Sequence, residues 1–361
     1  MFPDITPNPI NPLLFQTARI IFFVAISFFT ALIITPFWFK FLEKARFKKQ
    51  IREKSETPIF HKFHERKAGT PTAGGVIIWG TVLILALIFW FLDTFFDGPW
   101  KQLNFINRAE TYLPIVALVI AGFLGLVDDW FGVRRLGGAS GGGMKIRHKL
   151  VLYALIAAVG AWWFYFRLDW HVISVPFLGS FDIGLWYIPI FMFIIIASAF
   201  SANETDGLDG LLGGVCLFAV CSLITVAFIL GRYDLAAFGA AIVGALLAFL
   251  WFNIYPAKFF MGDTGSMSLG IVIGVITMLT DTTFLLPFFA VIFVVESLSV
   301  IIQIVSKKLR GKKVFLSSPL HHHFEALGWP ESQVTMRFWI VSAIFCALGL
   351  VVFFLSRLIA I

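Results

Sequence analysis

The segment Asn203-Glu204-Thr205-Asp206-Gly207-Leu208-Asp209-Gly210 combines acidic residues and glycines between two apolar runs, 185–200 and 211–230. Each run is long enough to cross, or nearly cross, a lipid bilayer. Carboxylates at the mouth of two membrane spans indicate an ion, substrate or metal site, because hydrocarbon excludes charges that have no partner. The alternative interpretation is a solvated turn that happens to be acidic.

The composition extends the membrane interpretation to the whole chain. Of the 361 residues, 59% are hydrophobic and only 14% are charged, which excludes an ordinary soluble globular protein. We therefore expect an all-α, polytopic membrane protein that forms a single domain over residues 1–361. The three cysteines lie inside apolar runs, so they predict neither a disulfide framework nor a zinc site.

The formal net charge of +7 belongs to a chain without a separate polar domain. We therefore expect its partners to be membrane lipids with anionic headgroups or phosphorylated substrates, and no nucleic acid.

Ten apolar segments are predicted to span the membrane. The third, fifth and eighth are shorter than the roughly 20 residues that a straight crossing prefers. In chain order, the segments are 15–38, 74–92, 112–127, 150–166, 185–200, 211–230, 235–252, 266–280, 284–305 and 338–356.

Lysine and arginine are concentrated in the loops that follow odd-numbered segments. Ten lie between residues 40 and 67, five between 134 and 149, and six between 307 and 337. The positive-inside rule places these loops in the cytoplasm. We therefore predict that both termini lie outside and that the acidic segment 203–210 belongs to an active site on the cytoplasmic face.

Two further acidic motifs lie on the same predicted side. Asp128 and Asp129 end the third segment, and adjacent helical residues point about 100° apart. We therefore expect one carboxylate to face a site while the other orients or binds something else. Asp263 lies between two glycines, and Ser266 is placed to cap the eighth segment. A structural contact for the acid pair and a simple turn for Asp263 are the alternatives.

The segment 203–210 also has internal spacing. Asp206 and Asp209 are three residues apart, which places them on one face if the segment is helical. Asn203 and Thr205 are suited to cap the following helix, leaving amide groups free to meet an anion. The two glycines allow the backbone to approach a ligand closely.

The ninth segment contains polar residues in an apolar run. Glu296, Ser299 and Gln303 share one helical face. A buried glutamate needs a partner, so an interhelical hydrogen bond and a role in the site are both open.

Two more motifs have the chemistry of phosphate binding. His321, His322 and His323 lack the helical spacing of a zinc site, but imidazoles bind phosphate oxygens and transfer protons. Lys67 and Thr72, before a glycine pair, resemble a phosphate cradle. A solvated loop and a lipid-binding basic loop are the respective alternatives. Together with the acids, these motifs favour Mg²⁺, which prefers hard carboxylate oxygens and commonly accompanies phosphates.

The motifs together resemble one family. Lys67-x-Gly-Thr-Pro-Thr-x-Gly-Gly, the Asp128-Asp129 pair, Asn203-x-Thr-Asp-Gly-Leu-Asp-Gly, Asn253 ten residues before Asp263, and the three histidines occur in this order. The chain is similar here to the polyprenyl-phosphate N-acetylhexosamine-1-phosphate transferases. The resemblance covers roughly residues 55–340. The three histidines and the Thr-Pro-Thr loop resemble the muramoyl-pentapeptide branch of that family.

This resemblance implies a reaction of peptidoglycan synthesis. Phospho-MurNAc-pentapeptide is transferred from UDP-MurNAc-pentapeptide to undecaprenyl phosphate, which gives lipid I and UMP and requires Mg²⁺. It also implies a multi-pass protein of the bacterial cytoplasmic (inner) membrane. A homodimer is left open, as is the choice between direct transfer and an aspartyl intermediate.

The resemblance further implies roles for individual residues. Asp128 resembles the base that deprotonates the lipid phosphate, Asp263 the magnesium ligand, and Asp129 and His321 further catalytic residues. The implied substrate-binding residues are Lys67, Thr72, Lys149, Asn203, Asp206, Asp209, Asn253, Ser266, His322 and His323.

The sequence also departs from the family pattern. Gly132 stands where relatives often have a basic residue, Glu204 replaces a leucine, and Ala73 replaces a methionine. A glycine-rich insertion at 137–143 makes the match at Lys149 less secure. The rival functions are a sister transferase that uses UDP-GlcNAc or another UDP-sugar, a secondary transporter, and a catalytically inactive scaffold.

Overall fold

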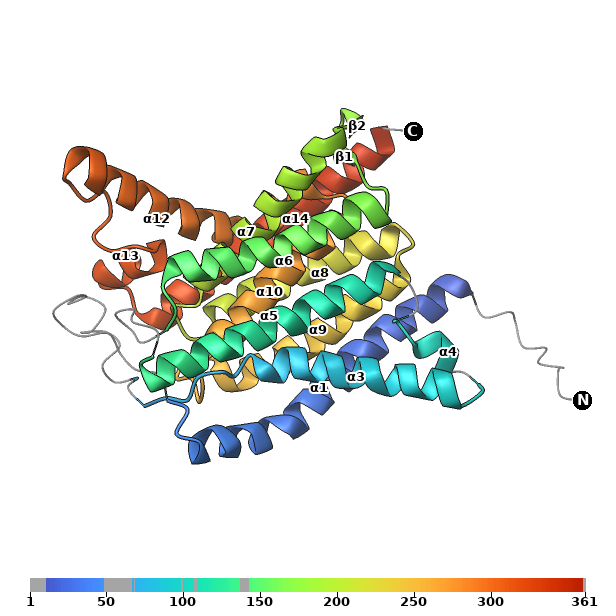
Figure 1. Ribbon diagram of the computed structural model, residues 1–361, viewed down its shortest axis with the longest axis horizontal. Coiled ribbons are helices and arrows are strands. Elements are labelled where there is room, and N and C mark those ends of the chain that lie inside the picture. The colour runs from blue at the N-terminus through green and yellow to red at the C-terminus, as the bar shows by residue number, and fades with distance from the viewer. Residues whose placement is uncertain are drawn as a thin grey trace, which may run out of the picture.

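The protein is a bundle of long helices (Figure 1). The computed structural model describes residues 11–48, 67, 69–98, 100–106, 109–136 and 143–359. Within these residues, nine helices are long and apolar enough to span a membrane. A tenth span is formed if 283–289 and 291–310, which are bent by 86°, count as one. The prediction of about ten membrane-spanning helices is therefore confirmed.

The helices have these bounds: α1 (Pro12–Lys44), α3 (Val76–Phe95), α4 (Trp100–Leu103), α5 (Ala109–Arg134), α6 (Ile146–Arg167), α7 (Tyr187–Thr205), α8 (Leu211–Ile229), α9 (Tyr233–Asn253), α10 (Gly262–Leu279), α11 (Leu286–Phe289), α12 (Val291–Arg310), α13 (Leu320–Ala326) and α14 (Glu331–Ile359). Short 3-10 helices cover Gly184–Trp186 and Thr283–Leu285. Most of the insertion 137–143 and residues 49–66 of the basic loop lie outside the described residues.

The three segments that looked too short are longer in the structure. The third becomes α5, which continues to Arg134, and the fifth becomes α7, which continues to Thr205. The eighth becomes α10, which starts four residues earlier than predicted, at Gly262. The polar residues at these helix ends hid the extensions, because apolar runs were used to delimit the spans.

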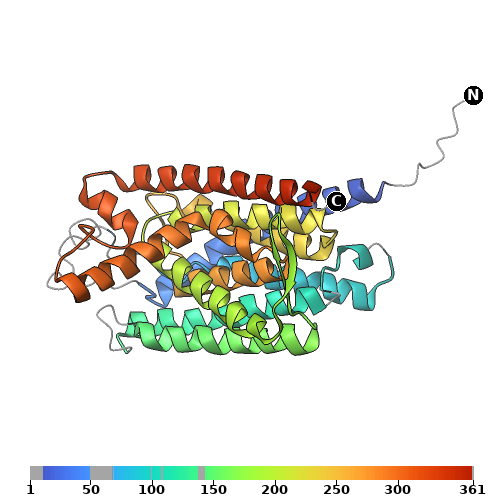
Figure 2. The same ribbon diagram turned by 90° about the horizontal axis from the view of Figure 1, so that it is seen from above.

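The centre of the bundle is formed by α9 and α10. In the apolar 18-residue stretch of each helix, 83% of the residues of α9 and 94% of those of α10 are buried inside the protein. Helix α10 packs against α5 and α7, and α9 packs against α1 and α8. Figure 2 shows α14 (red) and the green α5–α6 pair on opposite sides of the bundle. The first residues of α10 are therefore enclosed by several helices.

One end of the bundle holds both the start of α1 and the end of α14 (Figure 1). This agrees with an even number of crossings, while the prediction that this end faces outside stays a prediction. The hairpin β1 (Val172–Val175) and β2 (Gly179–Asp182) lies there too and is the one sheet among the described residues. Its strands are antiparallel, with Ser174 paired to Ser180.

Helix α12 leaves the bundle at the opposite end (Figure 1). Its polar face is buried, including Glu296, Ser299 and Gln303, which confirms that these residues share one face. Apolar residues such as Leu298 and Ile301 are exposed instead. This inverted pattern suits a helix whose outer face contacts lipid. The same end of the bundle contains α13, the ends of α5 and α7, and the starts of α8, α10 and α14.

Candidate active site

Four polar residues from four helices meet where α10 begins, and we call them the acidic centre: Asp128 on α5, Lys149 on α6, Asn203 on α7 and Asp263 on α10. Lys149 Nζ lies 2.7 Å from Asp128 Oδ2 and 2.7 Å from Asp263 Oδ1. The Asn203 amide donates to Asp263 Oδ1 and, at 3.1 Å, to Ser266 Oγ. The structure thus joins five of the predicted site residues.

Burial explains why the acidic centre needs its lysine. The Asp128 side chain is 0% exposed, and its Oδ1 accepts the backbone N–H of Met144 at 2.6 Å. A buried carboxylate is costly unless a charge or hydrogen bonds compensate it. Lys149 provides that charge for Asp128 and Asp263 together. Asp263, whose side chain is 23% exposed, is the more accessible acid.

Asp129 has a different task from its neighbour. Its carboxylate accepts the backbone N–H groups of Asp263 and Thr264, both at 3.1 Å, and the hydroxyl of Thr72 at 3.3 Å. These N–H groups belong to the first turn of α10, whose amides have no intrahelical acceptor. The carboxylate of Asp129 therefore caps α10 and fixes the backbone of Asp263, the metal-ligand candidate, which agrees with the expected division of labour between adjacent acids.

Ser266 does not cap α10 as predicted. The helix already begins at Gly262, and Ser266 is fully buried within it. Its hydroxyl accepts the hydrogen bond from Asn203 instead. The prediction was wrong because the capping group comes from α5, and a capping partner from another helix leaves no local signal in the sequence.

Glycines allow the backbones to approach one another closely at the start of α10. A Cβ on Gly125 of α5 would lie 2.3 Å from the carbonyl oxygen of Asp263. A Cβ on Gly75, just before α3, would lie 2.2 Å from the Cα of Gly265. Both separations are far below van der Waals contact, so only glycine fits at these two positions.

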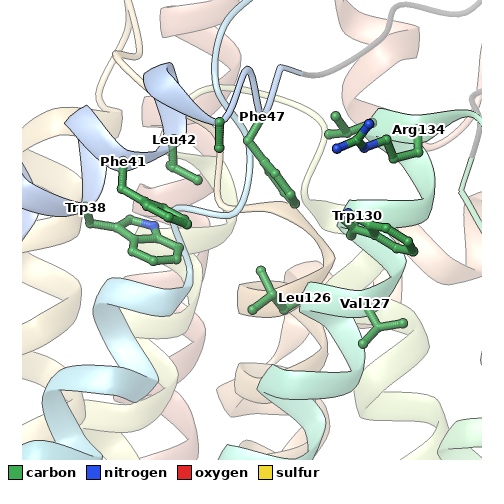
Figure 3. A pocket seen from close by; sticks show the side chains of 10 residues that line it. Trp38, Phe41, Leu42, Phe47, Leu126, Val127, Trp130 and Arg134 are labelled. Carbon is green, nitrogen blue, oxygen red and sulfur yellow. The ribbon is translucent and has the colours of Figure 1, made fainter.

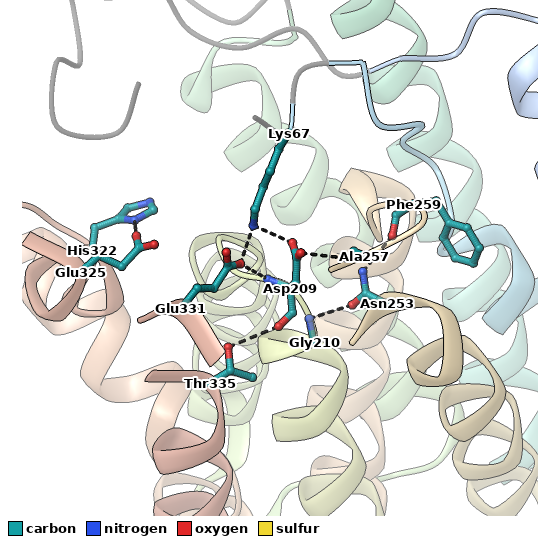
Figure 4. A network of polar contacts seen from close by, with 10 residues as sticks. All are labelled: Lys67, Asp209, Gly210, Asn253, Ala257, Phe259, His322, Glu325, Glu331 and Thr335. Carbon is teal, nitrogen blue, oxygen red and sulfur yellow. Dashed lines mark hydrogen bonds and ion pairs between the residues drawn. The ribbon is translucent and has the colours of Figure 1, made fainter. Parts of the chain in front are cut away.

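A second polar group, the lysine cluster, consists of Lys67, Asp209 and Glu331 (Figure 4). Lys67 Nζ lies 2.6 Å from Asp209 Oδ1 and also contacts Glu331 Oε1. Nearby, Asn253 accepts the N–H of Gly210 at 3.0 Å and donates to the carbonyl of Phe259 at 2.9 Å. The structure thus brings Lys67, Asp209 and Asn253 to one place, and Asn253 ties two loops together.

The segment between α7 and α8 is a turn, so the helical interpretation of Asp206 and Asp209 was wrong. Helix α7 ends at Thr205, and α8 begins after Gly210, whose φ of 75° favours glycine. Asn203 and Thr205 do not cap α8: they belong to α7, and the Thr205 hydroxyl bonds back to Ser201. Asp206 itself follows the last residue of α7 and is in contact with other groups.

The three consecutive histidines have three different partners. Together they lie in the seven-residue helix α13, where successive side chains point about 100° apart. His321 is buried, with Nδ1 3.1 Å from Glu296 Oε2. His322 Nδ1 lies 2.7 Å from Glu325 Oε2, and His323 Nδ1 accepts the N–H of Leu316. The histidines therefore do not converge on one ligand.

His321 connects α12 to the turn at Gly207. Glu296 accepts its backbone N–H at 3.2 Å, and a Cβ on Gly207 would lie 2.1 Å from His321 Nε2. Burial lowers the pKa of the imidazole, but the carboxylates of Glu296 and Glu325 outweigh it and raise the pKa above its ordinary value. For Glu296, the interhelical contact is thus confirmed. Gly207 makes room for a histidine.

The rest of the polar face of α12 holds the loop before α13. The Gln303 side chain donates to the carbonyl of Phe315 at 2.9 Å and accepts the N–H groups of Val314 and Phe315 at 3.0 Å. Because one side chain satisfies three backbone groups, the path of the loop is fixed relative to the helix.

The acidic centre fits a magnesium ion. In the part of the chain that the structure describes, no three His, Cys, Asp or Glu side chains form a group ready to hold a metal. Asp128 and Asp263 nevertheless converge on one cation, the Lys149 ammonium. Mg²⁺ is typically bound by one or two carboxylates together with waters and substrate phosphates, which is the donor set that these two acids offer.

A separate cavity of about 450 Å³ lies between the ends of α1 and α5 (Figure 3). Aromatic and aliphatic side chains line it, among them Trp38, Phe41 and Trp130, with Arg134 at one edge. None of the predicted site residues contributes to its lining. The candidate active site is therefore the polar region around the acidic centre and the lysine cluster, and this apolar cavity lies outside it.

Two contacting residues were missed in the sequence, Glu331 and Glu325. Glu331 is the first residue of α14, the last span, and Glu325 lies within the short helix α13. The available signal was their position: both follow the histidines on the predicted cytoplasmic side. Only the folded chain shows that their carboxylates meet Lys67 and His322.

Comparison with known proteins places the chain in a family. Residues 112–281 match glycosyl transferase family 4. The phospho-N-acetylmuramoyl-pentapeptide-transferase of Anoxybacillus flavithermus is 39% identical over 336 residues, which cover 92% of this chain and 97% of that protein. The proteins of the same name from Geobacillus thermodenitrificans and Borrelia garinii subsp. bavariensis are 38% and 37% identical, over 92% of this chain and 97% and 95% of theirs.

These likenesses extend over nearly the full length of each protein, and the family match at 112–281 contains all four residues of the acidic centre. The chain therefore belongs to the phospho-N-acetylmuramoyl-pentapeptide-transferase family and is a phosphosugar transferase.

Proposed function

We propose that the protein transfers phospho-MurNAc-pentapeptide from UDP-MurNAc-pentapeptide to undecaprenyl phosphate, forming lipid I and UMP in peptidoglycan synthesis. The observation that carries the proposal is the pairing of Asp128 and Asp263 through one lysine at the end of the bundle. Two acids that converge on one cation provide a place where a metal and two phosphates can meet.

Mg²⁺ held by Asp263, with Asp128 beside it, would neutralise the charge that develops on the transferred phosphoryl group. The two acids share the Lys149 ammonium in the structure. Arrival of the substrate phosphates gives that ammonium new anionic partners, which frees carboxylate oxygens. The positive charge of Lys149 then lies beside the reacting phosphates and helps to align them.

In the reaction, an oxygen of undecaprenyl phosphate forms a bond to the sugar-bound phosphorus of the donor. The bond from that phosphorus to the oxygen of the UMP group breaks, and UMP leaves with the electron pair. We assign to Asp128 the role of holding the proton that the acceptor phosphate gives up, and its greater burial than Asp263 supports this assignment. Asp129 and Thr72 keep the start of α10, and with it Asp263, in position.

The donor side is assigned to the region between the lysine cluster and α13. Lys67 supplies a positive charge for the diphosphate, and Asn253 fixes the loops around it. His322 and His323 lie on α13 at the same end of the bundle and present imidazoles to phosphate oxygens. Asp206 and Asp209 flank this region in the turn before α8.

The acceptor needs access from the membrane because its prenyl tail stays in lipid. Helix α12 is bent by 86° from the preceding helix and exposes apolar residues on its outer face. Its inner face carries Glu296, which contacts His321. A lipid tail that follows the outer face thus reaches the end of the bundle where the acidic centre lies. From the distribution of lysine and arginine, we infer that this end lies on the cytoplasmic side of a bacterial inner membrane.

An assay in proteoliposomes tests this function. Purified protein, undecaprenyl phosphate and Mg²⁺ are mixed with UDP-MurNAc-pentapeptide or, in a parallel reaction, with UDP-GlcNAc. UMP release and lipid I formation are expected with the first donor alone. Asp263→Asn and Asp128→Asn should each abolish turnover, whereas the exposed-site variant Asp97→Asn should retain it. Release of UMP with UDP-GlcNAc alone would assign the protein to the sister reaction.

A further inference from the structure

The ammonium group of Lys67 lies between two carboxylates from distant parts of the chain (Figure 4). One is Asp209 in the turn before α8, and the other is Glu331, the first residue of α14. The side chain of Lys67 is only 15% exposed, that of Asp209 4% and that of Glu331 11%. An ammonium has three donors, and two of them are directed at these acids. The position of the lysine is therefore determined by both carboxylates.

Glu331 also holds the turn to which Asp209 belongs. Its Oε1, which contacts Lys67, accepts the backbone N–H of Asp209 at 2.7 Å. The second oxygen of Asp209 accepts the N–H of Ala257 at 3.0 Å. One glutamate oxygen thus fixes the distance between the lysine and the peptide that presents its other partner.

The contact is one of three from the same face of α14. Thr335 donates its hydroxyl to the carbonyl of Asp209 at 3.3 Å, and the indole N–H of Trp339 donates to the carbonyl of Gly210 at 3.2 Å. Residues 331, 335 and 339 are four apart, so they form one stripe along the helix. Two of the three contacts only support the turn. Glu331 differs because it alone of the three contacts Lys67.

We infer that Glu331 is a positioning residue for substrate binding: it holds the Lys67 ammonium where the diphosphate of the UDP-sugar docks. This inference rests on the proposed function for the identity of the ligand. Lysine is a flexible side chain that loses much rotamer freedom when fixed. A charge-assisted bond to Glu331 provides that fixation before the substrate arrives, and the lysine keeps one donor for it.

The variant Glu331→Gln separates charge from shape. Glutamine has nearly the same size and still offers an oxygen to the N–H of Asp209, so the turn keeps its support. Removing a negative charge would by itself strengthen the binding of an anion. If Glu331 positions the lysine, the opposite occurs: the KM for UDP-MurNAc-pentapeptide and the Kd for UDP both rise about five- to tenfold. The kcat and the KM for undecaprenyl phosphate change less than twofold.

A double-mutant cycle shows whether Glu331 acts through Lys67. In the background Lys67→Met, the substitution Glu331→Gln should cause no further rise in the KM for the donor. Thr335→Val is the matched control, because it removes a contact between the same helix and the same turn but none with the lysine. Its effect should be under twofold and should persist unchanged when Lys67 is replaced.

A chemical readout makes the result independent of catalysis. The rate at which an amine-reactive reagent labels Lys67, followed by mass spectrometry, should rise severalfold in Glu331→Gln and stay at the wild-type value in Thr335→Val. Glu331→Asp, which keeps the charge but shortens the side chain, should raise the labelling rate less, and it serves if the glutamine variant does not fold.

The outcomes separate the two proposals. Wild-type protein that releases no UMP from any UDP-sugar refutes the proposed function, and the labelling rates then still decide whether Glu331 fixes Lys67. Wild-type protein that turns over normally, with an unchanged or lower donor KM in Glu331→Gln, overturns the positioning role alone. Additive effects of Glu331→Gln and Lys67→Met would do the same.

Discussion

Asp129 on α5 accepts a hydrogen bond from the backbone N–H of Thr264, 3.1 Å away on α10. The same carboxylate accepts the N–H of Asp263, so a side chain from one membrane-spanning helix caps the N-terminus of another. A negative charge at that position also interacts favourably with the helix dipole. The acid that follows Asp128 is therefore needed for the geometry of the site.

Replacement of Asp129 should destabilise the protein, and replacement by alanine should cost more than replacement by asparagine. Asparagine keeps one oxygen acceptor, so Asp129→Asn should cost about 1 kcal/mol, whereas Asp129→Ala leaves both amides without an acceptor and should cost about 2 kcal/mol. Thermal unfolding in detergent micelles measures both, with Asp97→Asn as the exposed control. Equal stability of the wild type and Asp129→Ala would show that α10 does not need this cap.

Lys149 should be essential for stability in the absence of metal. Lys149→Met leaves the carboxylates of Asp128 and Asp263 side by side without a cation, which should cost about 3 kcal/mol. Added Mg²⁺ should raise the thermal midpoint of the variant more than that of the wild type, because a metal that binds only the folded state stabilises it. Turnover should be lost in both conditions.

The exposed Lys145, four residues earlier, provides the control for this experiment. Lys145→Met should change neither the thermal midpoint nor its response to Mg²⁺. A Lys149→Met variant whose midpoint ignores Mg²⁺ would count against a metal position between the two acids.

The spans could be predicted from the sequence, and so could several polar residues that meet in the candidate site, whereas the pairing of their side chains could not. Hydropathy alone identifies the helices, since each must be apolar over its own length. Asp128 and Asp263 were recognisable as acids at the ends of apolar runs, whereas Lys149 was identified only through the resemblance to the family. That Lys149 bridges the two acids depends on how α5, α6 and α10 pack, and no spacing along the chain encodes this.

The turn before α8 shows why local reasoning failed there. The spacing of Asp206 and Asp209 matches a helix, yet Gly210 at φ 75° starts a new helix and a histidine fills the space beside Gly207. Glu331 was missed for the same reason, because its partners lie in the turn and in the loop of Lys67. Contacts between loops decide these features, so only the assembled bundle displays them.

The close contact between Gly75 and Gly265 should tolerate no side chain. A Cβ at Gly75 would lie 2.2 Å from the Cα of Gly265, and the backbones must then move apart. We expect Gly75→Ala to cost at least about 2 kcal/mol and to impair turnover by displacing the start of α10. Thermal midpoints and UMP release measure the two effects.

Gly80, inside the helix α3 that Gly75 precedes, is the matched control. A Cβ there meets only Val76 Cγ1 at 3.8 Å, an ordinary contact. Gly80→Ala should therefore be neutral or stabilise the protein by up to about 1 kcal/mol, since alanine favours helix more than glycine does. If both variants lost the same stability, general helix propensity and not the close approach would be responsible.

The contact between His321 and Glu296 should make stability depend on pH. The pKa of His321 is raised in the folded protein, because the attraction of Glu296 and Glu325 exceeds the opposing effect of burial, and Glu204 adds to it. A raised pKa means that the folded state holds the proton more tightly than the unfolded state, whose histidine titrates near about 6.5. The contribution is therefore complete below that pH and is lost as the pH rises through the folded pKa.

Thermal midpoints between about pH 6 and pH 9 should accordingly fall for the wild type across the window that starts near 6.5. Glu296→Gln removes the main charge that faces the imidazole, so its midpoint should be lower at pH 6 and should change less on going to pH 9. A Glu296→Gln variant with the full wild-type slope would show that another group titrates in this range.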